Sequence, residues 1–338
     1  MIKIGSGENT YKWVDQWASY PDTERVRSGW VHPGMIISGA GELYTTNTCE
    51  PVVLVYDLAG TLLRSWDAGG AEVHDLTLVE EDGVEYLWIT DNGSKRQPEI
   101  GYDYPPESPL TSGRVFKTTL DGEVVMHLGL PVLPDYEDSR CAVTETAVNE
   151  ERHGGNGDIW VADGYGESLV HRYDKTGNYL GTLNGEEGGG RFNCPHGIFV
   201  DTRKSEPEIY VADRANGRIQ VYDPAGRFKR AFGDEFLTLP STMVSHGDQL
   251  IIGQLSAKLT VVDLEDNLVC HLGANDSVCD VDGWPNNRDR AGKVIPTTLL
   301  EEGKFNSPHG LTVDASGNLY IAEWLIGGRV TKLERLNQ

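Results

Sequence analysis

The stretch FNCPHGIFVDTRKSEPEIYVADRANGR, residues 192–218, contains the plan of one structural unit. It begins with Phe-Asn-Cys-Pro-His-Gly, continues through an apolar run and a turn, and reaches a second apolar run that ends in an acidic residue. A second copy, FNSPHGLTVDASGNLYIAEW, occupies residues 305–324. Weaker copies bring the total to six units, at residues 34–70, 74–129, 146–185, 195–233, 241–273 and 308–336. Such self-similarity indicates a fold built from repeated supersecondary units.

Each unit has the pattern of four short strands. Runs rich in Val, Ile, Leu and Tyr alternate with Asp-Gly, Ala-Gly, Thr-Gly or Ser-Gly turns, and long amphipathic helix patterns are absent. One four-stranded sheet cannot bury both of its faces alone, but six sheets packed around an axis can. The sequence therefore predicts an all-β, six-bladed β-propeller of four-stranded blades, as a single domain over residues 1–338. The segment TYKWVDQWASY, residues 10–20, is expected to supply the outer strand of the last blade.

Two insertions interrupt the repeat. Residues 92–113 lie between the second and third strands of unit 2, and residues 274–304 follow the fourth strand of unit 5. In a propeller these two kinds of connection lie on the same face of the disc, so we expect both insertions to overhang one face. Long loops of this kind are often lids or walls of a binding site, and disordered decoration is the alternative.

The composition limits the partners of the chain. The net charge of −23 argues against binding to nucleic acid or to an anionic membrane, because both need clustered Lys and Arg, and it suits a protein that binds cations. No apolar run reaches the roughly 18 residues of a membrane span, and the first residues lack the apolar core of a signal peptide. We therefore expect a cytoplasmic protein. The five cysteines match no zinc-ligand spacing and are interpreted as buried thiols, with a Cys270–Cys279 disulfide as the alternative.

Three histidines stand at the start of the first strand in alternate units: His74, His196 and His309 in units 2, 4 and 6. Alternate blades of a six-bladed ring are about 120° apart and their first strands line the axis, so these imidazoles are expected to converge there. Three such ligands and an open fourth position suit a catalytic zinc, and iron, cobalt or copper are compatible with the same ligands. The alternative is that Pro-His-Gly is only an architectural feature of the repeat.

The other units differ at this position. The equivalent residues of units 1, 3 and 5 are His32-Pro33, Thr144-Glu145 and Ser241, and His32 lies ahead of the main motif. The remaining histidines are expected on outer strands or turns and not among the ligands: His127, His153, His171, His246 and His271.

The ends of the second strands are expected to rim the same face as the histidines. The polar residues there are Asn47, Asp91, Asp163 and Asp213, and the recurring acid is interpreted mainly as a repeat feature. Tyr165 and Arg214 follow two of these acids and are not repeated. An Arg beside a metal suits a substrate carboxylate, and a Tyr near a cation can act as a general base. The alternatives are an ion pair of Arg214 with Asp213 or Asp163, and simple packing of Tyr165 at the rim.

The units resemble NHL repeats and, more narrowly, the peptidyl-α-hydroxyglycine α-amidating lyase family. The segments that carry this resemblance are VADGYGESLVHRYD at 161–174, FNCPHGIFVD and YVADRANGRIQVYD within 192–223, FNSPHGLTVD at 305–314 and, less closely, VEYLWITD at 84–91. The resemblance implies a catalytic zinc on His74, His196 and His309, with Tyr165 and Arg214 in the active site. It also implies cleavage of a carbinolamide, N–CH(OH)–COO⁻, to an amide and glyoxylate.

The sequence departs from the family pattern at three places. A second active-site Arg of the family falls at Thr46-Asn47, a Met before the last Pro-His is Ser307, and an Asp that helps to bind a structural calcium is Gly310. Asp75, which follows His74, is a candidate replacement carboxylate, so calcium stays a second candidate cofactor. These departures favour a small α-hydroxy or hemiaminal-type substrate that carries a carboxylate over a peptide.

Two further functions stay open. The first is a metal-dependent hydrolase such as a lactonase, for which Glu145, Asn47 and Asp91 would hold a calcium ion. The second is a non-catalytic NHL binding module, which in so acidic a chain would bind a protein or a small molecule. Stoichiometric zinc supports the lyase, calcium alone supports the hydrolase, and neither metal supports the binding module.

Overall fold

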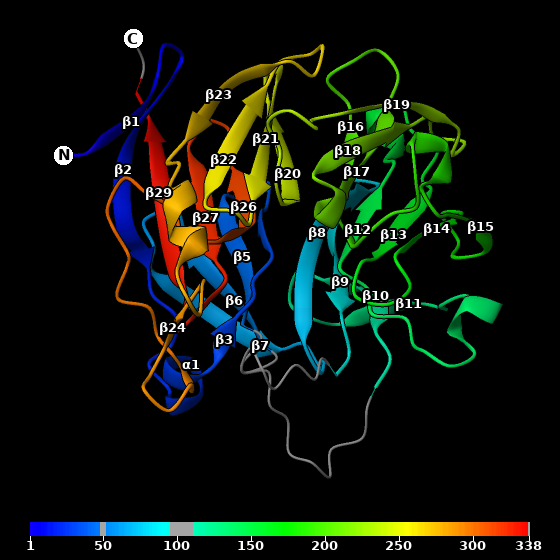
Figure 1. Ribbon diagram of the computed structural model, residues 1–338. Coiled ribbons are helices and arrows are strands. Elements are labelled where there is room, and N and C mark those ends of the chain that lie inside the picture. Colours follow the sequence, from blue (N-terminus) through cyan, green and yellow to red (C-terminus); the bar gives the residue numbers. More distant parts are fainter. Residues whose placement is uncertain (48–51, 95–110, 337–338) are drawn as a thin grey trace.

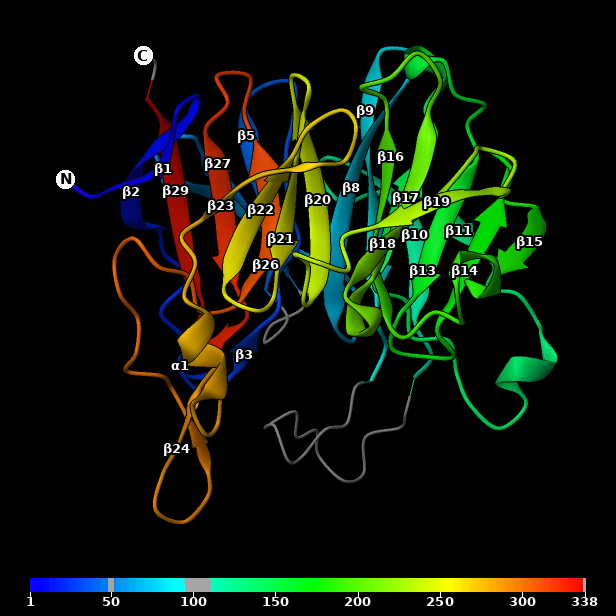
Figure 2. The same cartoon turned by 45° about the horizontal axis from the view of Figure 1, so that its top comes forward.

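The strands follow one another around a common axis in the computed structural model (Figure 1). The structure describes residues 1–47, 52–94 and 111–336. Within these ranges the long sheets number six, each antiparallel and of four strands or more, and they are arranged as the blades of a propeller. Figure 2 shows the same ring tilted, with strands β8, β16, β20 and β26 nearest its centre. The prediction of an all-β, six-bladed propeller is therefore confirmed.

Blades 1 to 5 use their strands in chain order from the axis outward, and blade 6 does so for its first three strands. Blade 1 consists of β4 (Met35–Ile37), β5 (Glu42–Asn47), β6 (Val52–Asp57) and β7 (Leu62–Asp67). Blade 2 consists of β8 (Val73–Glu81), β9 (Val84–Asp91), β10 (Arg114–Thr119) and β11 (Val124–Leu128). Blade 3 consists of β12 (Glu145–Val148), β13 (Ile159–Asp163), β14 (Leu169–Tyr173) and β15 (Tyr179–Leu183).

The second half of the ring repeats this order. Blade 4 consists of β16 (Pro195–Asp201), β17 (Glu208–Asp213), β18 (Arg218–Tyr222) and β19 (Phe228–Phe232). Blade 5 consists of β20 (Pro240–His246), β21 (Gln249–Gln254), β22 (Lys258–Val262) and β23 (Leu268–Leu272). Blade 6 consists of β26 (Pro308–Val313), β27 (Leu319–Glu323), β29 (Arg329–Arg335) and β2 (Asn9–Ala18), with β1 (Lys3–Ser6) outside them.

The N-terminal segment closes the ring. Strand β2 pairs antiparallel with β29, and Trp13 lies opposite Leu333. Figure 1 shows the blue first strands beside the red last strand. The buried guanidinium of Arg329 adds an ion pair across the same junction, with its Nη2 2.6 Å from Asp15 Oδ1. The expectation that residues 10–20 supply the outer strand of the last blade is confirmed.

The apolar core lies between the blades. Among the described residues, each pair of neighbouring blades shares one cluster of buried apolar side chains. Between blades 3 and 4, for example, Trp160 packs with Ile198 and Tyr222. Because alternate residues of each strand face the two neighbouring blades, a blade is stable only in contact with both of them.

Short elements lie between the blades and in the connections within them. These are α1 (Glu24–Ser28), the strand pairs β3 (Trp30–Val31) with β28 (Leu325–Ile326) and β24 (Asn287–Arg288) with β25 (Val294–Ile295), and the 3₁₀ turns Pro134–Tyr136, Glu151–His153, Glu186–Gly188, Arg214–Asn216 and Asp276–Asp280. Most of the predicted insertion 92–113 lies outside the described residues. The insertion 274–304 has its own small hairpin, and Val294 packs with Trp324 against the buried pair Trp30 and Ile326.

The cysteines and helices of the described ranges bear on two of the expectations from sequence. Cys270 and Cys279 are both reduced thiols there, so the alternative of a Cys270–Cys279 disulfide does not hold. The helices in these ranges are too short or too polar to cross a bilayer.

Candidate metal centre

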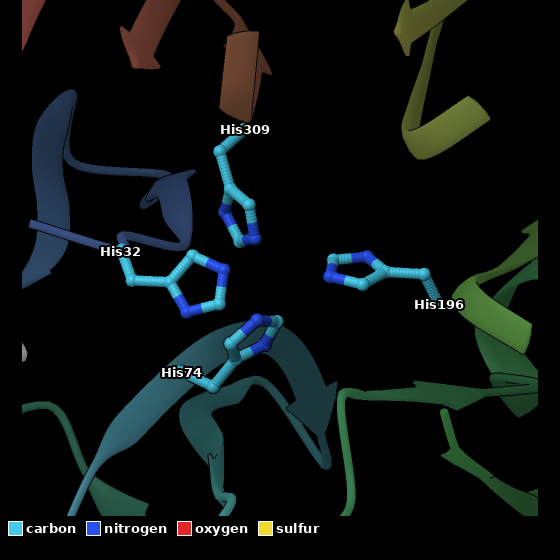
Figure 3. A group of neighbouring side chains, drawn as sticks. All are labelled: His32, His74, His196 and His309. Carbon is cyan, nitrogen blue, oxygen red and sulfur yellow. The ribbon is translucent and has the colours of Figure 1, made fainter. Parts of the chain in front are cut away.

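Three histidines stand at equivalent irregularities of the innermost strands. The pairing register shifts across His74 in β8, across His196 in β16 and across His309 in β26, so each of them is an extra residue without a partner directly opposite. A bulge of this kind bends the strand and re-aims one side chain. Here it turns all three imidazoles toward the axis of the ring, where Figure 3 shows them meeting.

Each of these imidazoles is held by the backbone of the next blade. The Nδ1–H of His74 donates to the Thr144 carbonyl at 2.5 Å, that of His196 to Ser241 at 2.9 Å, and that of His309 to Pro33 at 2.8 Å. A carbonyl can only accept, so the proton is on Nδ1 and the lone pair of each neutral ring is on Nε2. This is how proteins commonly orient a histidine that ligates a metal.

The glycine that follows two of these histidines permits this contact. A Cβ on Gly197 would lie 2.6 Å from the Ser241 carbonyl oxygen, and a Cβ on Gly310 would lie 2.7 Å from that of Pro33. These are the two oxygens that accept from His196 and His309. Any larger residue would push the neighbouring chain away, so Pro-His-Gly combines the bulge, the imidazole and the close approach of its acceptor.

A fourth histidine joins the three. His32 lies just after β3 and is buried, and Figure 3 shows its ring among the others. The ring centroids of His32 and His309 are 4.0 Å apart, and those of His32 and His74 are 4.3 Å apart. One ligand atom from each of the four residues lies within 4.8 Å of the others. His32 was not predicted among the ligands, although His-Pro-Gly at 32–34 is a reordered form of the repeated Pro-His-Gly.

Tyr165 and Arg214 lie beside this cluster. The Tyr165 hydroxyl is 2.9 Å from His196 Nε2 and 3.2 Å from His32 Nε2. Arg214 donates from Nη1 to the same hydroxyl at 3.3 Å, and its guanidinium carbon lies 5.3 Å from the centre of the Tyr165 ring. In the described part of the chain Arg214 forms no ion pair with an acid, and Asp213 pairs with Arg218 at 2.8 Å instead. The structure therefore brings Tyr165 and Arg214 to the same end of the axis as the histidine cluster.

Burial sets the protonation of these groups. It lowers the pKa of His196 well below its ordinary value, and the nearby Arg214, His74 and His309 act in the same direction. His196 is therefore a neutral imidazole that can donate a lone pair. Burial raises the pKa of Tyr165, although Arg214 opposes this effect, so the phenol keeps its proton at neutral pH.

The acids at the ends of the second strands have structural partners. Asp91 accepts from the backbone of Ala71 and Glu72, and Asp213 accepts from that of Asn193. Asp163 accepts likewise from Ala142 N and Glu167 N. Asn47 is buried at the end of β5, next to residues that the structure does not describe. The contacts with Glu72, Asn193 and Ala142 tie the end of a second strand to the start of the first strand of the same blade.

Two carboxylates lie farther along the axis. Asp75 and Glu145 line a cavity of about 430 Å³ that is surrounded by the innermost strands of the six blades. Burial raises the pKa of Asp75 to about 8 and that of Glu145 well above its ordinary value, with Asp75 as a second cause for Glu145. Asp75 is therefore beside the histidine cluster in sequence, but it belongs to the wall of this axial cavity.

The donor set of the histidine cluster fits a transition metal. Four buried imidazoles, three of them with the Nε2 lone pair fixed by a backbone acceptor, offer nitrogen ligands of the kind that zinc, iron, cobalt and copper prefer. Hard, oxygen-seeking calcium has no comparable affinity for imidazole. The protein is thus a six-bladed propeller with a buried histidine group on its axis that could bind a metal.

Known proteins are similar to this chain in sequence. No family model matches the chain. Human NHL repeat-containing protein 3 is 30% identical over 230 residues, which cover 63% of this chain and 58% of that protein. Peptidyl-alpha-hydroxyglycine alpha-amidating lyase 1 of Drosophila melanogaster is 25% identical over 272 residues, which cover 74% of this chain and 42% of that protein. The chain thus spans about half the length of these relatives.

A solved structure has the same fold as this chain. A streptogramin B lyase structure superimposes with a TM-score of 0.59 over 96% of this chain and 97% of that one, at 14% sequence identity. At this identity the likeness establishes the propeller fold alone. The predicted resemblance to NHL-repeat proteins and to the amidating lyases is confirmed by the two relatives above.

Proposed function

We propose that this chain is a zinc-dependent lyase of the carbon–nitrogen type that acts on a small α-hydroxy substrate with a carboxylate. The observation that carries the proposal is the axial cluster of His32, His74, His196 and His309, with Tyr165 in contact with it and Arg214 hydrogen-bonded to Tyr165. The sequence relationship to an amidating lyase supports the same class of reaction.

His74, His196 and His309 would hold the ion through Nε2, because their Nδ1 atoms are committed to carbonyl acceptors. When bound, zinc supplies Lewis acidity toward the substrate hydroxyl. Ligation would use the lone pair of His196 Nε2, so the Tyr165 hydroxyl, which lies 2.9 Å from that atom, would be available to the substrate. In an α-hydroxyglycine amide, the hydroxyl oxygen loses its proton and forms the aldehyde C=O of glyoxylate. The C–N bond breaks at the same carbon, and the amide nitrogen takes up a proton.

Tyr165 and Arg214 have different roles, proton transfer and substrate binding. Tyr165 accepts the hydroxyl proton, which requires its raised pKa to fall when a cation is close by. Arg214 has five N–H donors in a planar fork, and Tyr165 and Cys194 take only part of them. The guanidinium can therefore bind the substrate carboxylate and fix the hydroxyl toward the cluster.

The first test is metal analysis together with an assay of glyoxylate release from an N-acyl-α-hydroxyglycine. We expect the His196→Ala variant to contain about one transition-metal ion per chain less than the wild type and to release no glyoxylate above background. His153→Ala, which changes an exposed histidine outside the cluster, is the matched control and keeps both properties. Equal metal content in wild type and His196→Ala would contradict the proposed centre.

A second variant separates binding from chemistry. Tyr165→Phe removes only the hydroxyl, so we expect the metal content to stay and kcat to fall by roughly 10²–10⁴-fold, the usual contribution of a general acid–base group. An unchanged kcat would remove Tyr165 from the mechanism. A metal-loaded wild type that releases no glyoxylate would favour the hydrolase. That alternative has less support, because Asp91, one of its expected ligands, is already paired with Arg114 at 2.9 Å.

A further inference from the structure

The acid at the end of the second strand differs in its electrostatic partner from blade to blade. In three blades it forms an ion pair with an Arg directly opposite on the third strand: Asp91 with Arg114 at 2.9 Å, Asp213 with Arg218 at 2.8 Å and Glu323 with Arg329 at 3.1 Å. In blade 3 the residue opposite Asp163 is Leu169. In the ranges that the structure describes, Asp163 forms no ion pair with Lys, Arg or His, although it is fully buried.

Other polar side chains surround Asp163 instead. Cys141 at the start of blade 3 and His171 on β14 are both buried, and one ligand atom from each lies within 4.8 Å of Asp163 and of the other. The Tyr136 hydroxyl is 2.7 Å from Asp163 Oδ2 and 2.8 Å from His171 Nε2. A thiol, a carboxylate, an imidazole and a phenol therefore converge on one point, 0% exposed at Asp163 and His171.

The carboxylate of Asp163 is held by hydrogen bonds and not by a cationic side chain. In the described ranges its oxygens accept from Ala142 N, Glu167 N and the Tyr136 hydroxyl. An ionised Asp163 would be a buried charge without a compensating cation, which is costly.

We propose that Cys141, Asp163 and His171 bind a second transition-metal ion of the zinc class, which supplies in blade 3 the positive charge that an Arg supplies in blades 2, 4 and 6. A thiolate, a carboxylate and an imidazole are a ligand set that zinc accepts, and the Tyr136 hydroxyl is placed to complete four ligands. On binding, the Cys141 thiol loses one proton to solvent. The divalent ion then balances one thiolate and one carboxylate.

Neighbouring groups already orient these ligands. Asp163 Oδ1 accepts from Ala142 N at 2.6 Å, and Oδ2 accepts from Glu167 N at 2.8 Å. His171 Nδ1 lies 2.8 Å from the Thr182 hydroxyl, which can accept its proton and leave the lone pair on Nε2, the atom that faces Asp163 through Tyr136. Such outer contacts fix the tautomer of a metal-binding histidine. The competing explanation is a closed hydrogen-bond network in which Tyr136 donates to Asp163 and accepts from His171.

Cobalt distinguishes these two explanations. Metal-free full-length protein is titrated with Co²⁺, and the thiolate-to-cobalt charge-transfer absorption is followed. The axial cluster contains only imidazoles, so this band reports a cysteine ligand and not the proposed catalytic centre. We expect the band in the wild type and in His196→Ala, with release of one proton per ion at the thiolate site.

The variants assign the band to this site. Cys141→Ser is expected to lose it, and Cys270→Ser, which changes a partly buried thiol on β23, is expected to keep it. His171→Gln is the second variant. It places in blade 3 the residue that Gln220 provides at the same register position of blade 4, and it should weaken cobalt binding at least tenfold. A folded wild type without the band, or a band that survives in Cys141→Ser and His171→Gln, would establish the hydrogen-bond network and overturn the proposal.

Discussion

Blades 2, 4 and 6 share a strand order with blades 1, 3 and 5, yet the two sets contribute different groups to the axis. The even blades supply the bulged histidines, and the odd blades supply the carbonyl oxygens that accept from their Nδ1–H groups. Those oxygens belong to Thr144, Ser241 and Pro33, three residues with unrelated side chains. A backbone acceptor does not depend on the side chain that carries it. Duplicated units can thus build one centre in which half of them diverge freely at the critical position.

The largest effect on metal content and activity should come from removing a histidine of an even blade. His309→Ala removes one of the three oriented Nε2 ligands, and we expect loss of about one ion per chain and of all lyase activity. Ser241→Ala changes an odd blade at the equivalent position but keeps the carbonyl, so metal affinity should change by less than about tenfold, the lower bound for loss of an outer contact. Metal analysis and competitive chelation measure both. If Ser241→Ala were as damaging as His309→Ala, the odd blades would contribute more than a backbone acceptor.

The second test concerns the acids at the ends of the second strands. Arg218→Met leaves the buried Asp213 without its cation and should lower the free energy of unfolding by about 3 kcal/mol, as expected for breaking a buried pair. Leu169→Met at the equivalent position of blade 3 conserves volume and should cost less than about 1.5 kcal/mol. Urea denaturation of metal-free protein compares them. Equal losses would mean that the Arg contributes packing and not charge.

His32 provides the third test, because it is a histidine in an odd blade. If the ligands are the three even-blade residues, His32→Ala should keep the ion. Its ring lies 3.2 Å from the Tyr165 hydroxyl, so we expect turnover to fall by roughly 10–100-fold through loss of an outer contact. Metal content and kcat are measured on the same preparation. Loss of the ion in this variant would make the centre a four-histidine site.

The sequence was sufficient to predict features that recur with the repeat. It was insufficient for contacts that depend on how neighbouring strands are aligned. The six units, the closing strand and the convergence of His74, His196 and His309 followed from repeated motifs. His32 was missed because it precedes the first strand of its blade and reaches the axis through β3, which pairs with β28 from the other end of the chain. The pairing of Asp213 with Arg218 could not be read in advance either, since it needs the alignment of β17 with β18.

The smallest effect tests whether the even–odd division is confined to the axis. Glu208 in blade 4 and Glu42 in blade 1 both open a second strand and both bind an Arg of the fourth strand, Arg230 and Arg64 respectively. Although burial alone would raise it, hydrogen bonds from Arg230 and Lys229 lower the pKa of Glu208 to about 2. The pKa of Glu42 is lowered chiefly by its hydrogen bond to Arg64. Away from the histidines, an even and an odd blade thus use the same device.

A pH series makes this comparison quantitative. A carboxyl whose pKa is depressed in the folded protein binds fewer protons there than in the unfolded chain, so its stabilisation is complete above the ordinary value of 4.5 and is lost as the pH falls toward 2. Glu208→Gln should therefore cost roughly 2 kcal/mol at pH 7, the usual range for hydrogen bonds to a charged group, and progressively less below pH 4.5. Glu42→Gln should give a smaller loss with the same sign, because a single Arg binds a more exposed carboxylate. Urea denaturation between pH 7 and pH 3 measures both differences, and a cost that did not shrink on acidification would show that shape and not charge holds these strand ends.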